Sequence, residues 1–164
     1  MDNEVLFYER QHFKQWWVYI LLILLSLQFI FALVTQVFLN EPYGNKPASN
    51  LIIIIATLFV LALTVFIRVQ VMITKVDDKG IYIKYSPIHR RWRHYPWYNI
   101  AHCEVKQYNP LMDYGGWGMR SGAYNMSGRD GMLITFKNRI TLMIGTKKPE
   151  ELKEVLQKLD KLKQ

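Results

Sequence analysis

Residues 16–39 read WWVYILLILLSLQFIFALVTQVFL, and residues 51–67 read LIIIIATLFVLALTVFI. Neither stretch contains a charged residue. At about 1.5 Å per helical residue, the uncharged run from Trp16 to Asn40 makes about 37 Å of helix and the run from Pro47 to Ile67 about 31 Å, against roughly 30 Å of hydrocarbon. We therefore predict two transmembrane helices, over about 16–39 and 48–67.

The segment between the two runs, NEPYGNKPASN, is rich in turn-forming residues, so the two spans are expected to form an antiparallel hairpin. Basic residues flank the spans unevenly: two precede the first span, one lies in the connecting loop, and four lie in the 20 residues after the second span. The positive-inside rule therefore predicts that both termini are cytosolic. An acidic start and the lack of a small-residue cleavage site disfavour a secretory signal peptide.

A few polar side chains interrupt the two spans. Gln28, Thr35 and Gln36 are spaced by seven and eight residues, which places them on one helix face. We interpret such residues as donors and acceptors of interhelical hydrogen bonds, either within the hairpin or in a dimer. The spans contain no ionisable residue at membrane depth, which disfavours a transport pathway. The polar residues considered are Ser26, Gln28, Thr35, Gln36, Thr57 and Thr64.

The positive charge of the chain is confined to its C-terminal part. The formal net charge is +8, and residues 68–164 contribute +9 whereas residues 1–67 contribute −1. The single cysteine, Cys103, excludes an internal disulfide and a thiolate-rich zinc site, and it fits a reducing compartment.

Most of residues 68–164 has the pattern of strands. VQVMITKV and IYIKYS flank the turn DDKG and predict a β-hairpin. AHCEVKQY alternates at Ala101, Cys103 and Val105, while MLITFKNRITLMIG predicts a second hairpin with a positive-φ turn at Asn138. Turn positions suit Asp77 and Asp78 in the first hairpin.

The last segment has the pattern of an amphipathic helix. Thr146 is expected to cap it, and Pro149 lies near its first turn. Its apolar stripe recurs at spacings of three and four and should pack on the sheet: Leu152, Val155, Leu156, Leu159 and Leu162. The predicted fold class is therefore α+β, with a two-helix transmembrane hairpin followed by an antiparallel β-sheet or barrel that one C-terminal α-helix closes.

Several motifs carry a resemblance to a known family. NPLMDYGGWGMR at 109–120, AYN at 123–125, IGT at 144–146 with PEEL at 149–152, and YERQHF at 8–13 resemble membrane-anchored bacterial proteins with a pleckstrin-homology-like (PH-like) domain and a YGGWG motif. The resemblance implies a cytosolic PH-like domain at 68–164, after an N-terminal segment at 1–15 and a hairpin at 16–67. It also implies the bacterial cytoplasmic (inner) membrane, and it transfers no catalytic residue.

The segment HRRWRH at 89–94 combines permanent cations with aromatic residues. We interpret Arg90, Arg91, Trp92 and Arg93 as a patch facing anionic lipid, because basic residues near such a surface each contribute roughly 1 kcal/mol. The alternative is a solvated basic edge that protects a sheet. A nucleic-acid role is not expected, since no RNP-like motif is present.

A glycine-rich loop at 114–131 is the second candidate site. Glycine permits positive φ and close approach of the backbone, so the loop could contact a partner, bind phosphate, or simply hold Trp117 against the sheet. Neither a Walker A pattern nor a GxGxxG motif is present. The candidate partner-contact residues are Tyr114, Gly115, Gly116, Trp117, Gly118 and Arg120.

No set of residues predicts an enzyme. His102 and Cys103 are strand neighbours, whose side chains point to opposite faces, and no carboxylate cluster accompanies them. We expect no catalytic residue, no metal site and no cofactor. The predicted function is a noncatalytic protein-interaction or assembly module, with membrane lipids and a protein partner or a second copy as partners; the alternatives are an anionic-lipid sensor and an accessory subunit of a membrane enzyme or transporter.

Overall fold

The computed structural model describes residues 4–120 and 122–163, and the chain divides into two compact units. One unit is Gln15–Val69, which is helical. The other combines Met1–Lys14 with Gln70–Gln164 and is rich in β-sheet. The fold is thus mixed α+β, as the sequence predicts.

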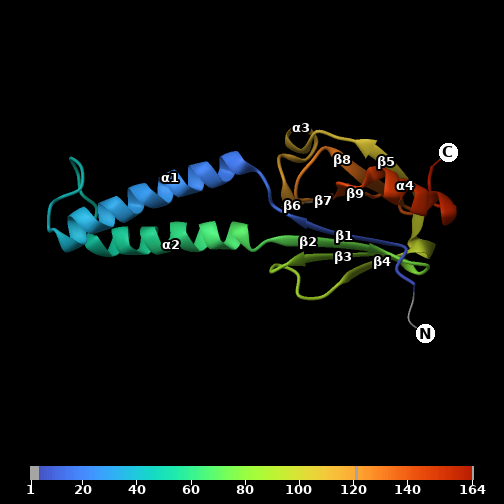
Figure 1. The fold of residues 1–164 in the computed structure, drawn as a ribbon, viewed down its shortest axis with the longest axis horizontal. Helices are drawn as coiled ribbons and strands as arrows, with labels where there is room; N and C mark the ends of the chain where they lie inside the picture. Colours follow the sequence, from blue (N-terminus) through green and yellow to red (C-terminus); the bar gives the residue numbers. More distant parts are fainter. Residues whose placement is uncertain (1–3, 121, 164) are drawn as a thin grey trace. The chain divides into compact units, whose positions relative to one another are not determined.

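The helical unit is a hairpin of two apolar helices. Helix α1 (Trp16–Leu33) continues into the π-helical turn η1 (Val34–Phe38), and it packs side by side with α2 (Asn50–Arg68) (Figure 1). Both helical stretches are long and apolar enough to cross a membrane, and only 17% of the residues in the apolar window of each are buried. Most of the apolar surface of the hairpin therefore faces outward.

Polar side chains connect the two helices at three levels. Ser26 Oγ and Thr64 Oγ1 lie 3.4 Å apart, and Thr57 Oγ1 donates to the Phe29 carbonyl at 3.3 Å. Gln36 Nε2 donates to Asn50 Oδ1 at the start of α2 at 2.9 Å, and to the Ala48 carbonyl of the loop at 2.6 Å. The interhelical hydrogen bonds expected within the hairpin are confirmed at these positions.

The sheet-rich unit contains two sheets. The first has the order β1 (Phe7–His12), β2 (Val71–Val76), β3 (Gly80–Ser86) and β4 (Arg93–Pro96), all antiparallel. The second has the order β5 (Ile100–Gln107), β8 (Asp130–Phe136), β9 (Thr141–Thr146), β7 (Ala123–Asn125) and β6 (Gly118–Arg120). It is antiparallel except where β7 pairs with β9. The helices of this unit are η2 (Trp97–Asn99), α3 (Pro110–Tyr114) and α4 (Pro149–Lys158).

Strand β1 was not expected, because the sequence analysis assigned residues 1–15 to a separate segment. Phe7, Glu9 and Gln11 alternate as buried residues with exposed ones, which is the period of a strand. The Glu9 carboxylate accepts hydrogen bonds from Thr146 Oγ1 at 2.6 Å and from the Lys147 N–H at 2.8 Å. The residues before the hairpin are therefore part of the sheet-rich unit, tied to both β2 and the end of β9.

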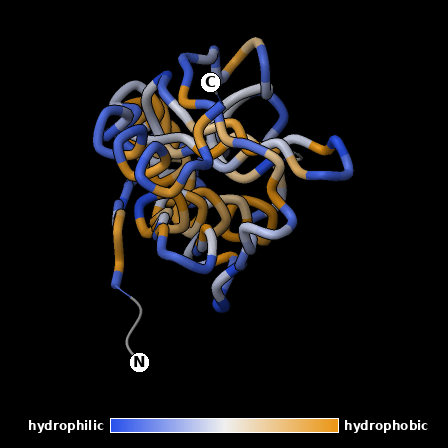
Figure 2. Tube along the Cα trace, turned by 90° about the vertical axis from the view of Figure 1, so that its right-hand side faces the viewer, coloured by the Kyte–Doolittle hydropathy of each residue, from blue (hydrophilic) through white to orange (hydrophobic). Residues whose placement is uncertain are grey.

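One core lies between the two sheets and α4, which contacts β1, β5 and β8. Leu152 and Leu156 of the predicted stripe are fully buried, and Leu159 is partly buried. Thr146 does not cap α4: its Oγ1 accepts from the Lys148 N–H, and the helix begins at Pro149. Hydrophilic residues gather in the peripheral loops (Figure 2).

Both predicted hairpins of this unit are present, with local corrections. In the β8–β9 turn the positive φ falls on Arg139 (65°), while Asn138 Oδ1 accepts a hydrogen bond from the Ile140 N–H. In β5 an irregular register buries Ile100 and exposes Ala101, whereas Cys103 is buried as expected.

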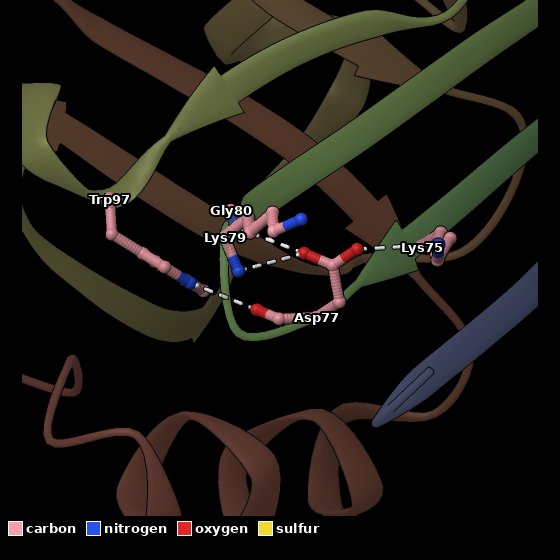
Figure 3. Close-up of polar contacts among 5 residues, drawn as sticks. All are labelled: Lys75, Asp77, Lys79, Gly80 and Trp97. Carbon is pink, nitrogen blue, oxygen red and sulfur yellow. Dashed lines mark hydrogen bonds and ion pairs between the residues drawn. The ribbon is translucent and has the colours of Figure 1, made fainter. Parts of the chain in front are cut away.

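The turn between β2 and β3 is organised by Asp77, whose side chain is buried (Figure 3). Its Oδ1 accepts from the N–H groups of Lys79 and Gly80 at 2.9 and 3.1 Å, and its Oδ2 lies 3.3 Å from Lys75 Nζ. Trp97 Nε1 donates to the Asp77 carbonyl at 2.9 Å. Asp77 is thus a turn residue, and it ties this turn to η2.

Candidate functional site

The predicted basic patch lies between β3 and β4. Arg90, Arg91 and Trp92 are exposed, and the nearby Ile88 is 43% exposed. Arg93 differs from them because its Nη1 donates to the Tyr124 hydroxyl at 2.7 Å and its guanidinium lies over the Tyr124 ring at 5.8 Å. Arg93 therefore connects the patch to β7 of the second sheet.

The predicted glycine-rich loop is largely built structure. Asn109 Oδ1 accepts from the N–H groups of Leu111 and Met112 and so caps α3. Gly115 ends that helix in the left-handed conformation, with φ of 69°. The Gly118 N–H donates to Asn125 Oδ1 at 2.7 Å, which fixes the β6–β7 ribbon. Gly115 and Gly118 thus have roles in the structure of the loop itself.

The other predicted loop residues lie between the end of α3 and the end of β6: Tyr114, Gly116, Trp117 and Arg120. The Tyr114 ring meets the Tyr108 ring edge-on at 5.7 Å between centroids, and Trp117 is partly buried. A Cβ added to Gly116 would lie 3.2 Å from Arg120 Nη2, so the lack of a side chain there leaves room for the guanidinium. A side chain at position 116 would therefore crowd the Arg120 guanidinium.

One hollow brings the two predicted sites together. It has a volume of about 290 Å³ and lies between β4 of the first sheet and the β6–β7 ribbon and β8–β9 turn of the second. Arg93 comes from the basic patch and Arg120 from the glycine-rich loop. The lining residues are Arg93, Tyr95, Arg120, Gly122, Tyr124, Phe136, Ile140, Thr141 and Leu142.

The hollow combines cationic and apolar surface. Among the residues that the structure describes, no carboxylate lies within ion-pair distance of Arg93 or Arg120. Burial, together with the neighbouring Tyr95, raises the pKa of Tyr124 to about 12, although Arg93 opposes the shift. The Tyr124 hydroxyl therefore keeps its proton at physiological pH, and the site has two permanent cations next to an aromatic and aliphatic wall.

Two edge strands border this hollow, and each has one side that is not paired with another strand in the described part of the chain. Within the residues that the structure describes, β4 pairs only with β3 at the edge of the first sheet, and β6 pairs only with β7 at the edge of the second. An edge strand exposes unpaired backbone groups, which can hydrogen-bond to an added extended segment.

Sequence reasoning found only part of this site. Arg90, Arg91 and Trp92 lie in the patch outside the hollow, and of the six candidate partner-contact residues Arg120 alone lines it, together with Gly122 and Tyr124 of the same loop. Tyr95, Phe136, Ile140 and Leu142 were missed. Tyr124 belongs to the AYN motif, but nothing in the sequence places it against Arg93, 31 residues away.

Metal and thiol chemistry find little support in the described part of the chain. No group of three or more His, Cys, Asp or Glu side chains there could hold a metal ion. Burial raises the pKa of Cys103 to about 12, which makes its thiol a poor nucleophile.

The fold and the hollow together define a class of protein: an apolar two-helix hairpin that carries a sheet-rich unit with a cationic, partly apolar hollow. The chain belongs to the family of unknown function DUF6141, which matches residues 2–159. No curated protein and no solved structure matches the chain.

Proposed function

We propose that this chain is an integral protein of the bacterial cytoplasmic (inner) membrane that spans it twice, with both termini in the cytosol. The length of the two apolar helices supports the spans. β1 precedes α1, β2 follows α2, and the two strands pair from Phe7–Val76 to His12–Val71. The flanks of the hairpin thus fold together, which supports placing both on one side of the membrane, and the distribution of basic residues favours the cytosolic side.

The sheet-rich unit is, in this proposal, a noncatalytic PH-like domain that serves as a protein-interaction or assembly module. Two packed sheets and a C-terminal helix that contacts β1, β5 and β8 support the PH-like assignment. The hollow between Arg93 and Arg120 is the observation that carries the binding function.

The hollow suits an extended, acidic segment of a partner protein. A carboxylate there would meet Arg120 and Arg93, and a neighbouring apolar side chain would pack on Phe136 and Leu142. The adjacent edge strands offer backbone hydrogen bonds that a peptide can use and a lipid headgroup cannot. These features favour a protein partner over a lipid.

A second candidate function is contact with anionic lipid through the basic patch. Arg90 and Arg91 are exposed, and the exposed Ile88 and Trp92 beside them could enter the headgroup region. Arg93 belongs to both sites, whereas Arg90 and Arg91 lie outside the hollow and Arg120 lies outside the patch, so variants at these three residues separate the two functions.

The partner is tested with a photo-crosslinking amino acid at Ile140, which is 61% exposed at the rim of the hollow. In native membranes we expect one protein to be captured there and not from the exposed Glu154 of α4. Capture should fall in the double variant Arg93→Gln/Arg120→Gln and persist in Arg90→Gln/Arg91→Gln, which loses the same charge. Equal capture in both variants would contradict binding in the hollow.

Lipid contact is tested with Trp92→Cys carrying an environment-sensitive fluorophore, in full-length protein embedded in nanodiscs. A blue shift is expected in anionic discs at low salt but not in neutral discs, because salt and loss of lipid charge both remove the attraction. Replacing Arg90, Arg91 and Arg93 with Gln should abolish the shift. An identical spectrum in anionic and neutral discs would eliminate lipid contact.

A further inference from the structure

Gln28 stands apart from the other polar residues of the hairpin. Thr35 Oγ1 donates to the Phe31 carbonyl of its own helix at 2.9 Å, and Gln36 binds Ala48 in the loop and Asn50 at the start of α2. Ser26, Thr57 and Thr64 also have partners within the hairpin. Gln28 is exposed and, among the residues that the structure describes, has no hydrogen-bond partner.

The lack of a hydrogen-bond partner is unusual because of the depth at which Gln28 lies in the helix. It lies 12 residues after Trp16 in a stretch that ends at Phe38, so it is roughly 18 Å from the start of the stretch and roughly 15 Å from its end. If the hairpin spans the membrane, as proposed above, this amide lies near the middle of the hydrocarbon. An unpaired polar group there costs free energy, so a partner outside the hairpin is expected.

We propose that two copies of this chain associate in the membrane through the α1 face that carries Gln28. A carboxamide has both a donor and an acceptor, so two Gln28 side chains related by twofold symmetry can satisfy each other with two hydrogen bonds. No other residue type is required, so a second copy by itself supplies the partner that the amide lacks.

The surroundings of Gln28 fit this interface. Leu24 and Phe31, one turn before and after it, are 62% and 60% exposed and extend the same apolar face. A cavity of about 240 Å³ opens beside the amide, lined by Phe29, Ala32 and Ile53 of the helices and by Tyr43, Lys46 and Ala48 of the loop. An aliphatic side chain of the second copy can enter it, in the manner of a knob in a hole.

Cysteine cross-linking of the full-length chain in native membranes tests the interface. Cys103 is buried, so the wild-type chain provides the background. Leu24→Cys places a thiol on the Gln28 face, and the adjacent Ile23→Cys, 53% exposed, points away from it at the same depth. Mercuric ion, which bridges two thiols, should produce a dimer from Leu24→Cys and much less from Ile23→Cys.

Variants of Gln28 in the Leu24→Cys background test the amide itself. Gln28→Leu should weaken dimerisation roughly tenfold, the size expected from two interhelical hydrogen bonds of modest strength, and Gln28→Asn, which keeps the amide, should restore most of it. Fluorescence transfer between labelled copies in vesicles measures the same change without cross-linking.

The inference would be overturned by equal dimer yield from the two cysteine positions, by no effect of Gln28→Leu, or by capture of Leu24→Cys by a protein of another mass. Labelling of Leu24→Cys by a membrane-impermeant maleimide in intact vesicles would instead show that the hairpin does not span the membrane, and it would remove this inference together with the proposed topology. Protection from the maleimide without dimers overturns the inference alone.

Discussion

The two units of this chain use buried polar groups in opposite ways. In the sheet-rich unit, Glu9 and Gln11 reach across to Thr146 and Gly145, more than 130 residues away in the sequence. In the hairpin, Thr57 and Thr64 each donate to the carbonyl four residues earlier at 2.7 and 2.9 Å, and their contacts with the other helix are longer, at 3.3 and 3.4 Å. Because helices satisfy their own backbone, the hairpin needs little polar connection, whereas the sheets use it to fix which segments meet.

This comparison has a consequence for stability. The sheet-rich unit excludes water from an apolar core, so defects in its core or its buried polar bonds should be costly. The hairpin exposes its apolar residues and gains little from burial. Substitutions in the two units should therefore differ in magnitude.

The largest effect is expected for Leu156→Ala in the core beneath α4. Loss of a fully buried leucine should cost about 2–5 kcal/mol, because the cavity it leaves is not refilled. In full-length protein in mild detergent, the labelling rate of the buried Cys103 thiol should rise by roughly 30-fold or more. Leu159→Ala, which removes a partly buried side chain, should have a smaller effect. An unchanged labelling rate would indicate that the stripe faces a partner.

A smaller loss is expected for Glu9→Ala, which tests whether the N-terminal strand belongs to the sheet-rich unit. The substitution leaves Thr146 Oγ1 and the Lys147 N–H without their acceptor, at a cost of about 1.5–3 kcal/mol. The labelling rate of Cys103 again measures this loss of stability. The control is Glu154→Ala on the exposed face of α4, whose stability is expected to stay within about 0.5 kcal/mol of the wild type. Equal labelling rates in the two variants would indicate that β1 does not belong to the sheet-rich unit.

How well an element could be predicted from the sequence depends on how far apart in the sequence its interacting residues lie. The hairpin, the β2–β3 turn and the α4 stripe depend on neighbours in sequence, and residues 16–39, Asp77 and Leu156 reveal them. Strand β1 was missed because its buried positions include Glu9 and Gln11, whose hydrogen-bond partners are distant in the sequence. The hollow was missed because Arg93 and Arg120 converge only when the two sheets pack.

A pH effect is expected at His89, whose ring meets the Tyr124 ring at 5.9 Å. Burial, and then the charge of Arg93, lower the pKa of His89. The folded state therefore binds this proton less readily than the unfolded state, so stability is present above the unfolded pKa and falls as the pH drops through it. Between pH 7.5 and 5, Cys103 protection should decrease more in wild type than in His89→Gln, and identical pH profiles would contradict this assignment.

The smallest effect is expected in the hairpin, for Thr57→Val. Thr57 is 3% exposed, and its hydroxyl donates to the Ile53 carbonyl at 2.7 Å and to the Phe29 carbonyl at 3.3 Å. Valine keeps the shape, and the carbonyls retain their helical partners, so the loss should be about 0.6 kcal/mol, the average for a hydrogen bond between membrane helices. The loss is measured by SDS titration in mixed micelles, with energy transfer between labels on the two helices as the signal. A loss above about 2 kcal/mol would mean that polar contacts hold the hairpin as strongly as they hold the sheets, and the contrast between the two units would fail.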